Sequence, residues 1–559
     1  QFIAQKNTKE RTRHEKKKEN VACKAITLTD EQKTVYTFLA KNIITPAYTP
    51  TLLHGVTGSG KTEVYKKLIT TAMAQNKSVI LLLPEVTLAT QFERLLHQEL
   101  PSSITLHGFH SATSPREKRQ LWKNVLNKKP IVIVGVHLPV LLPIANLGLI
   151  IIDEEHETGY QEKKHPKINS KEAALIRAKL CNIPILLGSA TPSFSSLYNV
   201  SIKRWHFFQL KKRFSGSFPT IKTVFLTENK NRKKFWITKE LHNAITDRLQ
   251  KKEQTIVFIN RRGFSFFVQC KECEFIFQCT SCSVSLTLHK NNILTCHYCS
   301  YSRSLPPQCP KCKADEKKFL KKGIGTQQVV TILKKLFPHA RVERADMDTT
   351  TNKKKWQQTI ADFSEQKIDI LVGTQTITKG YHFPNVTLVG IIWADLNIHL
   401  PFYNAAETAL QQLIQVAGRA GRQKEGSLVI AQSMGDHPIF NYLNEVDYLN
   451  FYKQEIASRK EVRYPPYVRF IEIEIKNTDE TTIENESQDI TFFLFDQAKK
   501  YPNTMILGPS KPPVHTIKKT HARKIYIKTD NIKTAIVLFQ SINFLCYKSS
   551  IFFTPNPGQ

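Results

Sequence analysis

The sequence predicts an α/β protein with two parallel-sheet lobes, a cysteine-rich insert and a C-terminal α+β domain. Short apolar runs alternate with helical patterns over residues 51–187, and again from Thr255 onward, as is typical of βαβ units with helices on both sheet faces. Within the second stretch, eight of the eleven cysteines form four C-x-x-C pairs. At 559 residues the chain is too long for one hydrophobic core, so several domains are expected.

The charge balance indicates a polyanionic partner. Lysine and arginine number 80 against 47 aspartates and glutamates, a formal net charge of +33. Nucleic acid fits this excess better than a membrane surface. A compositional bias of the genome is an alternative source of some of the lysines.

No stretch has the pattern of a membrane span or a signal peptide. Residues 131–152 are long and uncharged, but Pro139, Pro143 and two glycines interrupt them, so two buried strands explain them better than a bilayer helix. The N-terminus is basic and polar, without an apolar signal region. We therefore expect a cytoplasmic protein with no membrane partner. Because the chain begins with Gln1 rather than Met, we also expect it to be a fragment or a trimmed chain.

The segment GVTGSGKT has the G-x-x-x-x-G-K-[ST] pattern of a phosphate loop. An apolar run precedes it, and a helical pattern with Val64, Leu68 and Ala72 on one face follows it. Glycines in such a loop let main-chain N–H groups surround phosphates at the positive end of a helix. The predicted phosphate-loop residues are Gly55, Val56, Thr57, Gly58, Ser59, Gly60, Lys61 and Thr62. The motif predicts a bound nucleoside triphosphate, with Lys61 on its β- and γ-phosphates and the Thr62 hydroxyl on Mg²⁺.

Gln32 lies shortly upstream of this loop and has two interpretations. Thr29 and Gln32 have the spacing of a capping box at a helix start. The functional alternative is that Gln32 contacts the adenine of the nucleotide. Spacing alone leaves both open.

The run LIIIDEEH predicts a buried strand that ends in carboxylates beside the phosphate loop. Asp153 is expected to hold Mg²⁺, directly or through water, and Glu154 to orient or deprotonate the attacking water. Residues 188–191 (GSAT) end another apolar strand, and their hydroxyl groups are candidates for sensing the nucleotide, although a plain turn would look similar.

The segment QVAGRAGR predicts paired arginines, Arg419 and Arg422, on a glycine-containing helix. Both suit an arginine-finger role, meeting the γ-phosphate across a cleft between the lobes. The alternative is a basic solvated face. Because Gly418 and Gly421 are poor helix formers, a merely solvated helix would have little reason to contain them.

The four C-x-x-C pairs predict two structural Zn²⁺ sites, because four thiolates complete one tetrahedral site. Disulfides are disfavoured for this spacing in a cytoplasmic protein. We assign the two middle pairs to one zinc and the two outer pairs to the other, while sequential pairing remains open. The predicted ligands are Cys270, Cys273, Cys279, Cys282, Cys296, Cys299, Cys309 and Cys312.

Residues 436–559 combine helical patterns, a proline turn and strand patterns, which suggests a small α+β domain. A basic group near its end is a candidate contact for phosphate backbone, or is simply solvated. This group is Lys518, Lys519, Arg523 and Lys524.

Taken together, GVTGSGKTEVY, LLLPEVTLATQ, IIIDEEH, LGSATPS, FINRRGF, GTQTITKGYHFPNVTLVG and QVAGRAGR resemble the motifs of superfamily 2 DNA helicases. The four C-x-x-C pairs just after NRRGF make the chain similar to the replication-restart helicases of the primosomal protein N′ (PriA) family. The resemblance runs from about Leu28 to the C-terminus. It implies two RecA-like lobes, ATP as the nucleotide, and 3′-to-5′ DNA unwinding driven by ATP hydrolysis.

The resemblance also implies recognition of abandoned replication forks and the start of primosome assembly. The implied partners are forked and single-stranded DNA, primosome proteins, single-stranded-DNA-binding protein and the replicative helicase. Relative to the family, the N-terminal DNA-binding region is expected to be absent. Three segments depart from the family pattern, each where DNA coupling is expected: HPKIN at 165–169, GVHL at 135–138 and FYN at 402–404.

The predicted division is a linker or N-terminal remnant (1–27), an ATP-binding lobe 1 (28–225), a lobe 2 (226–435) with the zinc insert (268–314), and a C-terminal domain (436–559). The leading function is an ATP-dependent DNA helicase. The alternative is a zinc-stabilised fork-binding platform with a weak or uncoupled ATPase, which the three departures favour. An RNA helicase is disfavoured by the position of the zinc insert.

Overall fold

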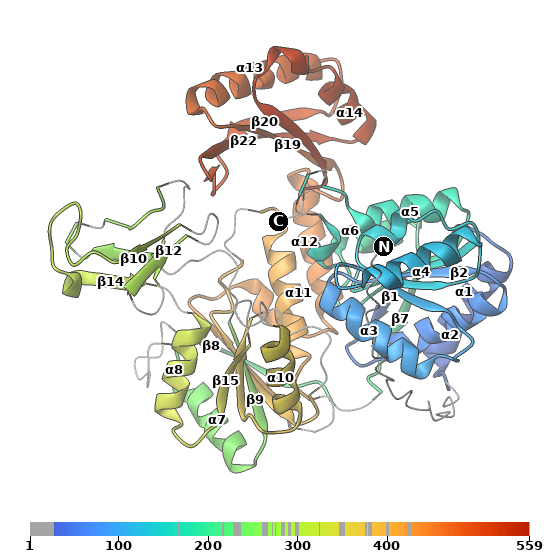
Figure 1. The fold of residues 1–559 in the computed structure, drawn as a ribbon, viewed down its shortest axis with the longest axis horizontal. Helices are drawn as coiled ribbons and strands as arrows, with labels where there is room; N and C mark the ends of the chain where they lie inside the picture. Colours follow the sequence, from blue (N-terminus) through green and yellow to red (C-terminus); the bar gives the residue numbers. More distant parts are fainter. Residues whose placement is uncertain are drawn as a thin grey trace, which may run out of the picture.

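The computed structural model describes residues 27–557, with the exception of 163, 166, 215–216, 227–235, 260–266, 271, 274, 281–285, 289–291, 297–300, 323–324, 346–352, 375–376, 378–382, 399–401 and 422–425. Within these residues, no helix is both long enough and apolar enough to cross a bilayer. In Figure 1 the two lobes, the insert and the C-terminal domain occupy different regions of the molecule.

Lobe 1 is a seven-stranded parallel sheet in the order β3-β4-β2-β5-β6-β1-β7, which confirms the predicted βαβ rhythm. Its strands are β1 (Pro50–Gly55), β2 (Ser78–Leu82), β3 (Leu106–Phe109), β4 (Val132–Gly135), β5 (Leu147–Asp153), β6 (Ile185–Ser189) and β7 (His206–Leu210). Its helices are α1 (Asp30–Ile44), α2 (Lys61–Ala74), α3 (Val86–Glu99), α4 (Pro115–Leu126), α5 (Ser170–Leu180) and α6 (Phe194–Ser201), with short 3-10 turns η1 (Leu138–Leu141) and η2 (Thr158–Tyr160).

The central strand β5 is buried along its whole length because helices cover both faces of the sheet. Successive side chains point to opposite faces. Leu149 and Ile151 pack into the cluster with α1, α2 and α3, whereas Ile150 and Ile152 pack into the cluster with α5 and α6. This double burial explains the continuous apolar run and places Asp153 at the carboxyl edge of the sheet.

Lobe 2 is a six-stranded parallel sheet in the order β15-β16-β9-β17-β18-β8. Its strands are β8 (Thr220–Phe225), β9 (Gln254–Ile259), β15 (Val342–Ala345), β16 (Ile370–Gly373), β17 (Val386–Ile392) and β18 (Leu428–Ser433). Its helices are α7 (Lys239–Gln250), α8 (Thr326–Leu336), α10 (Lys353–Ser364) and α11 (Ala405–Ala417). Figure 1 shows α11 on the side of lobe 2 that faces lobe 1.

The cysteine-rich insert has a small core of its own and projects beside lobe 2 in Figure 1. Its strands β10 (Phe267–Cys270) and β14 (Phe319–Lys322) pair antiparallel. A second small sheet contains β11 (Thr287–Leu288), β12 (Ile293–Thr295) and β13 (Ser302–Ser304), and a 3-10 turn, η4 (Glu316–Lys318), precedes β14.

The C-terminal domain is an antiparallel sheet covered by helices, as predicted. It contains β19 (Arg469–Asn477), β20 (Met505–Ser510), β21 (Thr516–Ile517), β22 (Thr520–Thr529), β23 (Ser550–Pro555), α13 (Glu480–Ala498), α14 (Ile532–Gln540) and η7 (Phe544–Cys546). One prediction was wrong here. Arg523 is neither solvated nor available to phosphate, because it is 1% exposed and its guanidinium donates to Glu484 at 2.7 Å. Lys524 is bound to Glu472 at 2.6 Å.

After lobe 2 the chain returns to lobe 1 through η6 (Pro438–Tyr442) and α12 (Tyr448–Glu461). Tyr448 and Phe451 of α12 contact Phe194 of α6, with ring centroids 6.0 Å and 5.8 Å apart. Tyr448 also donates to the main-chain oxygen of Pro192 at 2.6 Å. The start of the predicted C-terminal domain therefore packs against both lobes, and the predicted domain boundaries stay a prediction.

Candidate nucleotide-binding site and zinc centre

The phosphate loop joins β1 to α2, the arrangement that the motif predicts. Gly58 and Gly60 both have a φ of +79°, in the left-handed region where a side chain would be strained. The ammonium group of Lys61 donates to the main-chain oxygen of Gly55 at 2.8 Å, so the lysine lies over its own loop. The loop thus has the backbone conformation and the cation that phosphate binding requires.

Gln32 fulfils the capping prediction and also supports the phosphate loop. Its side-chain oxygen accepts from the Thr29 main-chain N–H at 2.9 Å, completing the capping box. Its amide nitrogen donates to the Ser59 main-chain oxygen at 2.9 Å, in a buried position. Gln32 therefore ties α1 to the loop, and the adenine contact stays a prediction.

Asp153 lies at the end of β5, separated from β1 by β6 alone. The Tyr65 hydroxyl donates to its carboxylate at 2.9 Å. Burial, with the neighbouring Glu154 carboxylate, raises the pKa of Asp153 to about 7. A Cβ added at Gly188 would clash with the Tyr65 hydroxyl, so this glycine makes the contact between Tyr65 and Asp153 possible.

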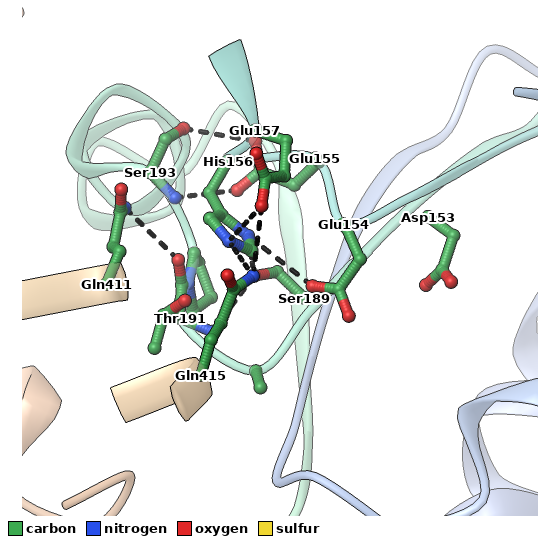
Figure 2. A network of polar contacts seen from close by, with 12 residues as sticks. Asp153, Glu154, Glu155, His156, Glu157, Ser189, Thr191, Ser193, Gln411 and Gln415 are labelled. Carbon is green, nitrogen blue, oxygen red and sulfur yellow. Dashed lines mark hydrogen bonds and ion pairs between the residues drawn. The ribbon is translucent and has the colours of Figure 1, made fainter. Parts of the chain in front are cut away.

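Glu154 has a φ of +49°, an uncommon conformation for a residue other than glycine. Its side chain is 28% exposed, and its Oε2 lies 3.6 Å from His156 Nδ1. No hydrogen bond to Oε2 forms within the described part of the chain. Figure 2 shows Glu154 at the edge of a polar network, with Asp153 beyond it. The strained backbone separates the directions of the two adjacent carboxylates, which suits different roles for them.

Glu155, the second glutamate of the motif, is a structural residue. It is 2% exposed and accepts from the Ser193 main-chain N–H at 2.7 Å and the Ser196 hydroxyl at 2.8 Å, beside the ammonium group of Lys171. Burial acts to raise its pKa, but Lys171 and these donors lower it overall. Glu155 thereby fixes the start of α6 against the end of β5.

His156 links the two lobes (Figure 2). Its Nδ1 lies 2.7 Å from the Ser189 hydroxyl, and its Nε2 lies 2.7 Å from the amide nitrogen of Gln415 on α11. Because this amide nitrogen can only donate, His156 Nε2 is the acceptor and Nδ1 holds the ring proton. Ser189 also accepts from the main-chain N–H of Thr191 at 2.9 Å. The GSAT segment is thus joined to the carboxylate motif on one side and to lobe 2 on the other.

Three polar residues of α11, four positions apart, face lobe 1. Glu407 accepts from the main-chain N–H of Phe194 at 2.8 Å. Gln411 donates to the main-chain oxygen of Thr191 at 3.2 Å, and Gln415 contacts His156. This stripe was not predicted from the sequence, although the spacing of these residues at i, i+4 and i+8 in a largely apolar helix was a visible signal of it.

The helix that was predicted to contain both arginines ends before the first of them. α11 ends at Ala417 with Gly418 as its C-cap, so Arg419 lies in the following turn. A Cβ added at Gly418 would lie 3.1 Å from the Thr57 hydroxyl, which shows how closely this turn approaches the phosphate loop. Gly418 is therefore present because it ends the helix against the loop. Arg422 lies outside the described residues, and the finger roles of both arginines stay predictions.

The outer cysteine pairs form one cluster, as predicted. Four sulfur atoms lie within 4.8 Å of one another, those of Cys270, Cys273, Cys309 and Cys312. The Cys270–Cys312 and Cys273–Cys309 sulfur distances are both 3.6 Å. These distances are too long for disulfides and near the roughly 3.8 Å edge of a tetrahedron with Zn–S bonds of about 2.3 Å. The donor set fits a structural Zn²⁺. The alternative in which the first C-x-x-C pair shares its zinc with the second pair is therefore excluded.

The inner zinc site is only partly within the described residues. Cys279 and Cys296 are buried, whereas Cys282 and Cys299 lie outside the described part of the chain. Their predicted pairing stays a prediction.

The segment 165–169, which departs from the family pattern, lies against the C-terminal sheet. His165 bonds Glu474 of β19 at 2.9 Å and stacks on Phe552 with centroids 4.0 Å apart. Lys167 forms an ion pair with Glu472 at 3.2 Å. The other two departures also make contacts within the protein, since His137 bonds Ser170 and the half-buried Tyr403 stacks on Tyr464. In this structure the basic groups of the segment contact protein carboxylates.

Comparison with known proteins identifies both lobes and the insert. Residues 29–200 match the DEAD/DEAH box helicase family, and residues 318–424 match the helicase conserved C-terminal domain. Residues 279–303 match the Cys-rich region domain of PriA DNA helicase. A solved structure, RecG bound to a three-way DNA junction, covers 79% of this chain and 47% of that chain, with 18% identity and a TM-score of 0.43.

The relatives are replication restart proteins. PriA of Bacillus subtilis strain 168 is 37% identical over 507 residues, covering 90% of this chain and 62% of that protein. PriA of Rickettsia felis is 34% identical over 511 residues, covering 90% of this chain and 76% of that protein. The chain thus spans about three-fifths of the length of the Bacillus relative. On these matches, and with the site geometry that agrees with them, the chain belongs to the PriA family of replication restart helicases.

Proposed function

We propose that this chain is the ATP-driven motor of a DNA helicase that unwinds DNA in the 3′-to-5′ direction, recognises abandoned forks and starts primosome assembly. The proposed partners are forked and single-stranded DNA, primosome proteins, single-stranded-DNA-binding protein and the replicative helicase. Family membership supports these assignments, and the relatives are named replication restart proteins. The net charge of +33 agrees with DNA as the partner.

The observation that carries the proposal is the meeting of three elements at one edge of lobe 1. The phosphate loop, the end of β5 and the end of α11 converge there, with Gln415 bonded to His156 and Gly418 packed on Thr57. Such a junction allows nucleotide binding in lobe 1 to determine the position of lobe 2.

In the proposed reaction, the phosphate-loop N–H groups and Lys61 bind the triphosphate. Thr62 and Asp153 are the residues that would hold Mg²⁺, which supplies charge neutralisation on the phosphates. Glu154 orients the attacking water and accepts its proton. Arg419 and Arg422 stabilise the charge that develops on the γ-phosphate. Tyr65 holds Asp153, and Gln415 keeps His156 fixed beside Glu154.

The test compares three proteins in ATP hydrolysis and ATP binding. Lys61→Ala should abolish hydrolysis, because a neutral stub cannot balance the phosphate charge. Arg422→Ala should lose most of the rate while ATP binding survives, because its role is confined to the transition state. Equal ATPase rates in all three proteins would reject the assignment.

The second candidate function is a zinc-stabilised fork-binding platform with a weak or uncoupled ATPase. The contact of residues 165–169 with Glu472 and Glu474 favours it, since these groups are bound to protein instead of being free for DNA. Stimulation of ATP hydrolysis by forked DNA, with RNA as the comparison, separates the two candidates. Stimulation by the fork supports the motor, and an unstimulated basal rate supports the platform.

A further inference from the structure

A buried carboxylate from outside both lobes is bound directly to the phosphate loop. Glu445 lies in the connector between η6 and α12 and is 3% exposed. Its Oε2 accepts from the main-chain N–H of Thr57 at 3.0 Å, and its Oε1 accepts from the Thr57 hydroxyl. Thr57 is the third residue of the loop. An acidic group therefore takes two donors of a loop whose composition suits it to binding anions.

An arginine beside the same loop is the counter-ion of this carboxylate. Arg213 is 4% exposed, and its Nη2 lies 3.7 Å from Glu445 Oε2. Its segment is attached to the loop at both ends, because Val56 donates to the main-chain oxygen of Leu210 at 3.1 Å and Phe214 donates to that of Gly58 at 2.9 Å. Arg213 is thus a buried cation held against the phosphate loop.

The guanidinium of Arg213 is incompletely bonded. Its Nη1 donates to the Ser217 main-chain oxygen at 3.1 Å, and its plane lies over the Phe218 ring at 4.4 Å. Its Nε is buried and finds no hydrogen-bond acceptor among the described residues. A buried donor without a partner is costly, so a second acceptor at this position would be favourable. A phosphate oxygen is the acceptor that arginine geometry suits best.

We propose that Glu445 is an internal competitor of the nucleotide. It takes the Thr57 donors and neutralises Arg213 until the phosphates of ATP replace it, and Arg213 then turns to the phosphates. This inference rests on the proposed function, because it takes ATP as the ligand of the loop. Glu445 is a positioning residue and touches no reacting atom.

The physical reason is that the carboxylate and the triphosphate compete as like charges for the same donors. Binding of either weakens binding of the other, and the effect is reciprocal. Displacement of Glu445 frees the connector between η6 and α12, which leads into the helix that packs on Phe194. ATP binding would in this way loosen one attachment between the lobes while the γ-phosphate draws the arginines of lobe 2 inward.

The test is equilibrium binding of a non-hydrolysable ATP analogue, with Mg²⁺, to the whole chain. Glu445→Gln keeps the side-chain shape and removes the charge, so its affinity should rise about fivefold or more. Arg213→Gln should bind more weakly, and in the double variant the gain from Glu445→Gln should shrink. Glu461→Gln makes the same charge change at an exposed site on α12 and should leave affinity unchanged. Added salt should reduce the gain, since its origin is electrostatic.

Equal or weaker binding by a folded Glu445→Gln protein would overturn the competitor role, and wild-type affinity in Arg213→Gln would overturn the role of the arginine. Binding of the ATP analogue to Lys61→Ala shows whether the competitor role alone has failed or the proposed function has failed as well. Loss of binding in Lys61→Ala with no gain in Glu445→Gln leaves the nucleotide site standing and rejects the competitor.

A measurement on the unmodified chain covers the case in which a variant does not fold. The main-chain N–H groups of Val446 and Asp447 donate to the Asn444 side chain at 2.9 Å and 2.8 Å. Their hydrogen exchange should become faster when the ATP analogue binds, because the connector is released. Unchanged or slower exchange would contradict the proposal.

Discussion

Gln415 of lobe 2 donates to His156 of lobe 1 across 2.7 Å, and His156 is the fourth residue of the DEEH motif. The same amide nitrogen lies 3.2 Å from Glu157 Oε1. This contact joins the residue that follows the proposed catalytic carboxylates to the helix that precedes the proposed arginine fingers. We therefore expect a change in the position of either lobe to reach the other through this contact.

Replacement of Gln415 by alanine should therefore lower the ATPase rate by about fivefold to tenfold, the effect of about one hydrogen bond on a barrier. ATP binding should remain, since the phosphate loop is untouched. Gln358→Ala, on the exposed face of α10, is the matched control. A Gln415→Ala protein with wild-type kcat but weaker ATP binding would contradict the coupling role.

Tyr65→Phe should weaken the response to Mg²⁺. The variant loses the hydroxyl that donates to Asp153 and leaves the ring in place. Loss of a group that orients a metal ligand typically costs about tenfold in metal affinity, so the half-saturating Mg²⁺ concentration in ATP-analogue binding should rise about tenfold. Tyr36→Phe removes a hydroxyl that bonds Thr71, away from Asp153, and should leave the Mg²⁺ requirement unchanged. Equal Mg²⁺ curves for both variants would contradict the assignment.

Native mass spectrometry should find two zinc ions per chain. Cys270→Ser and Cys279→Ser should each remove one, and the double variant should remove both, because the two residues are assigned to different sites. Retention of one zinc by the double variant would show that the two cysteines share a site. A chelator should unfold the insert and leave ATP binding largely intact, since the insert has its own core.

The contact of His165 with Glu474 should depend on pH. Burial acts to raise the pKa of Glu474, but His165, Lys476 and Lys167 outweigh it and lower the pKa from 4.5 to about 2. A lowered carboxyl pKa stabilises the folded state above the unfolded value, and this stability is lost as the pH falls from 4.5 through about 2. The melting temperature of Glu474→Gln should fall below that of the wild type above pH 4.5, and the two should converge toward pH 2. Glu461→Gln is the control, and a constant difference between wild type and Glu474→Gln across this range would contradict the assignment.

The sequence was sufficient to predict those parts of the structure in which the spacing of residues along the chain determines the local geometry. The phosphate loop, the end of β5 at Asp153 and the outer cysteine set follow from local patterns, and the structure has each of them. The end of α11 was predicted wrongly, because Gly418 and Gly421 were interpreted as residues within a helix. In the structure Gly418 ends it, and Gly421 has a φ of +77°.

The contacts between distant segments were beyond prediction from the sequence. Glu445 and Thr57 are 388 residues apart, and no local pattern distinguishes Glu445 from a solvated glutamate. The same holds for Arg523, whose burial against Glu484 depends on how β22 lies under α13. Glu445 meets Thr57 only once the connector has packed on lobe 1, and Arg523 meets Glu484 only once the C-terminal sheet and its helix have packed together.

The return of the chain to lobe 1 has a topological consequence. The chain leaves lobe 1 after β7, builds lobe 2, and comes back through α12 to pack on Phe194 (Figure 1). Lobe 2 is thus an inserted domain, held at two crossings that are close to each other beside the phosphate loop, at Arg213 and at Glu445. While Glu445 stays bound to the loop, these two links lie side by side, so we expect lobe 2 to move by rotating about the line through them and not by separating freely from lobe 1.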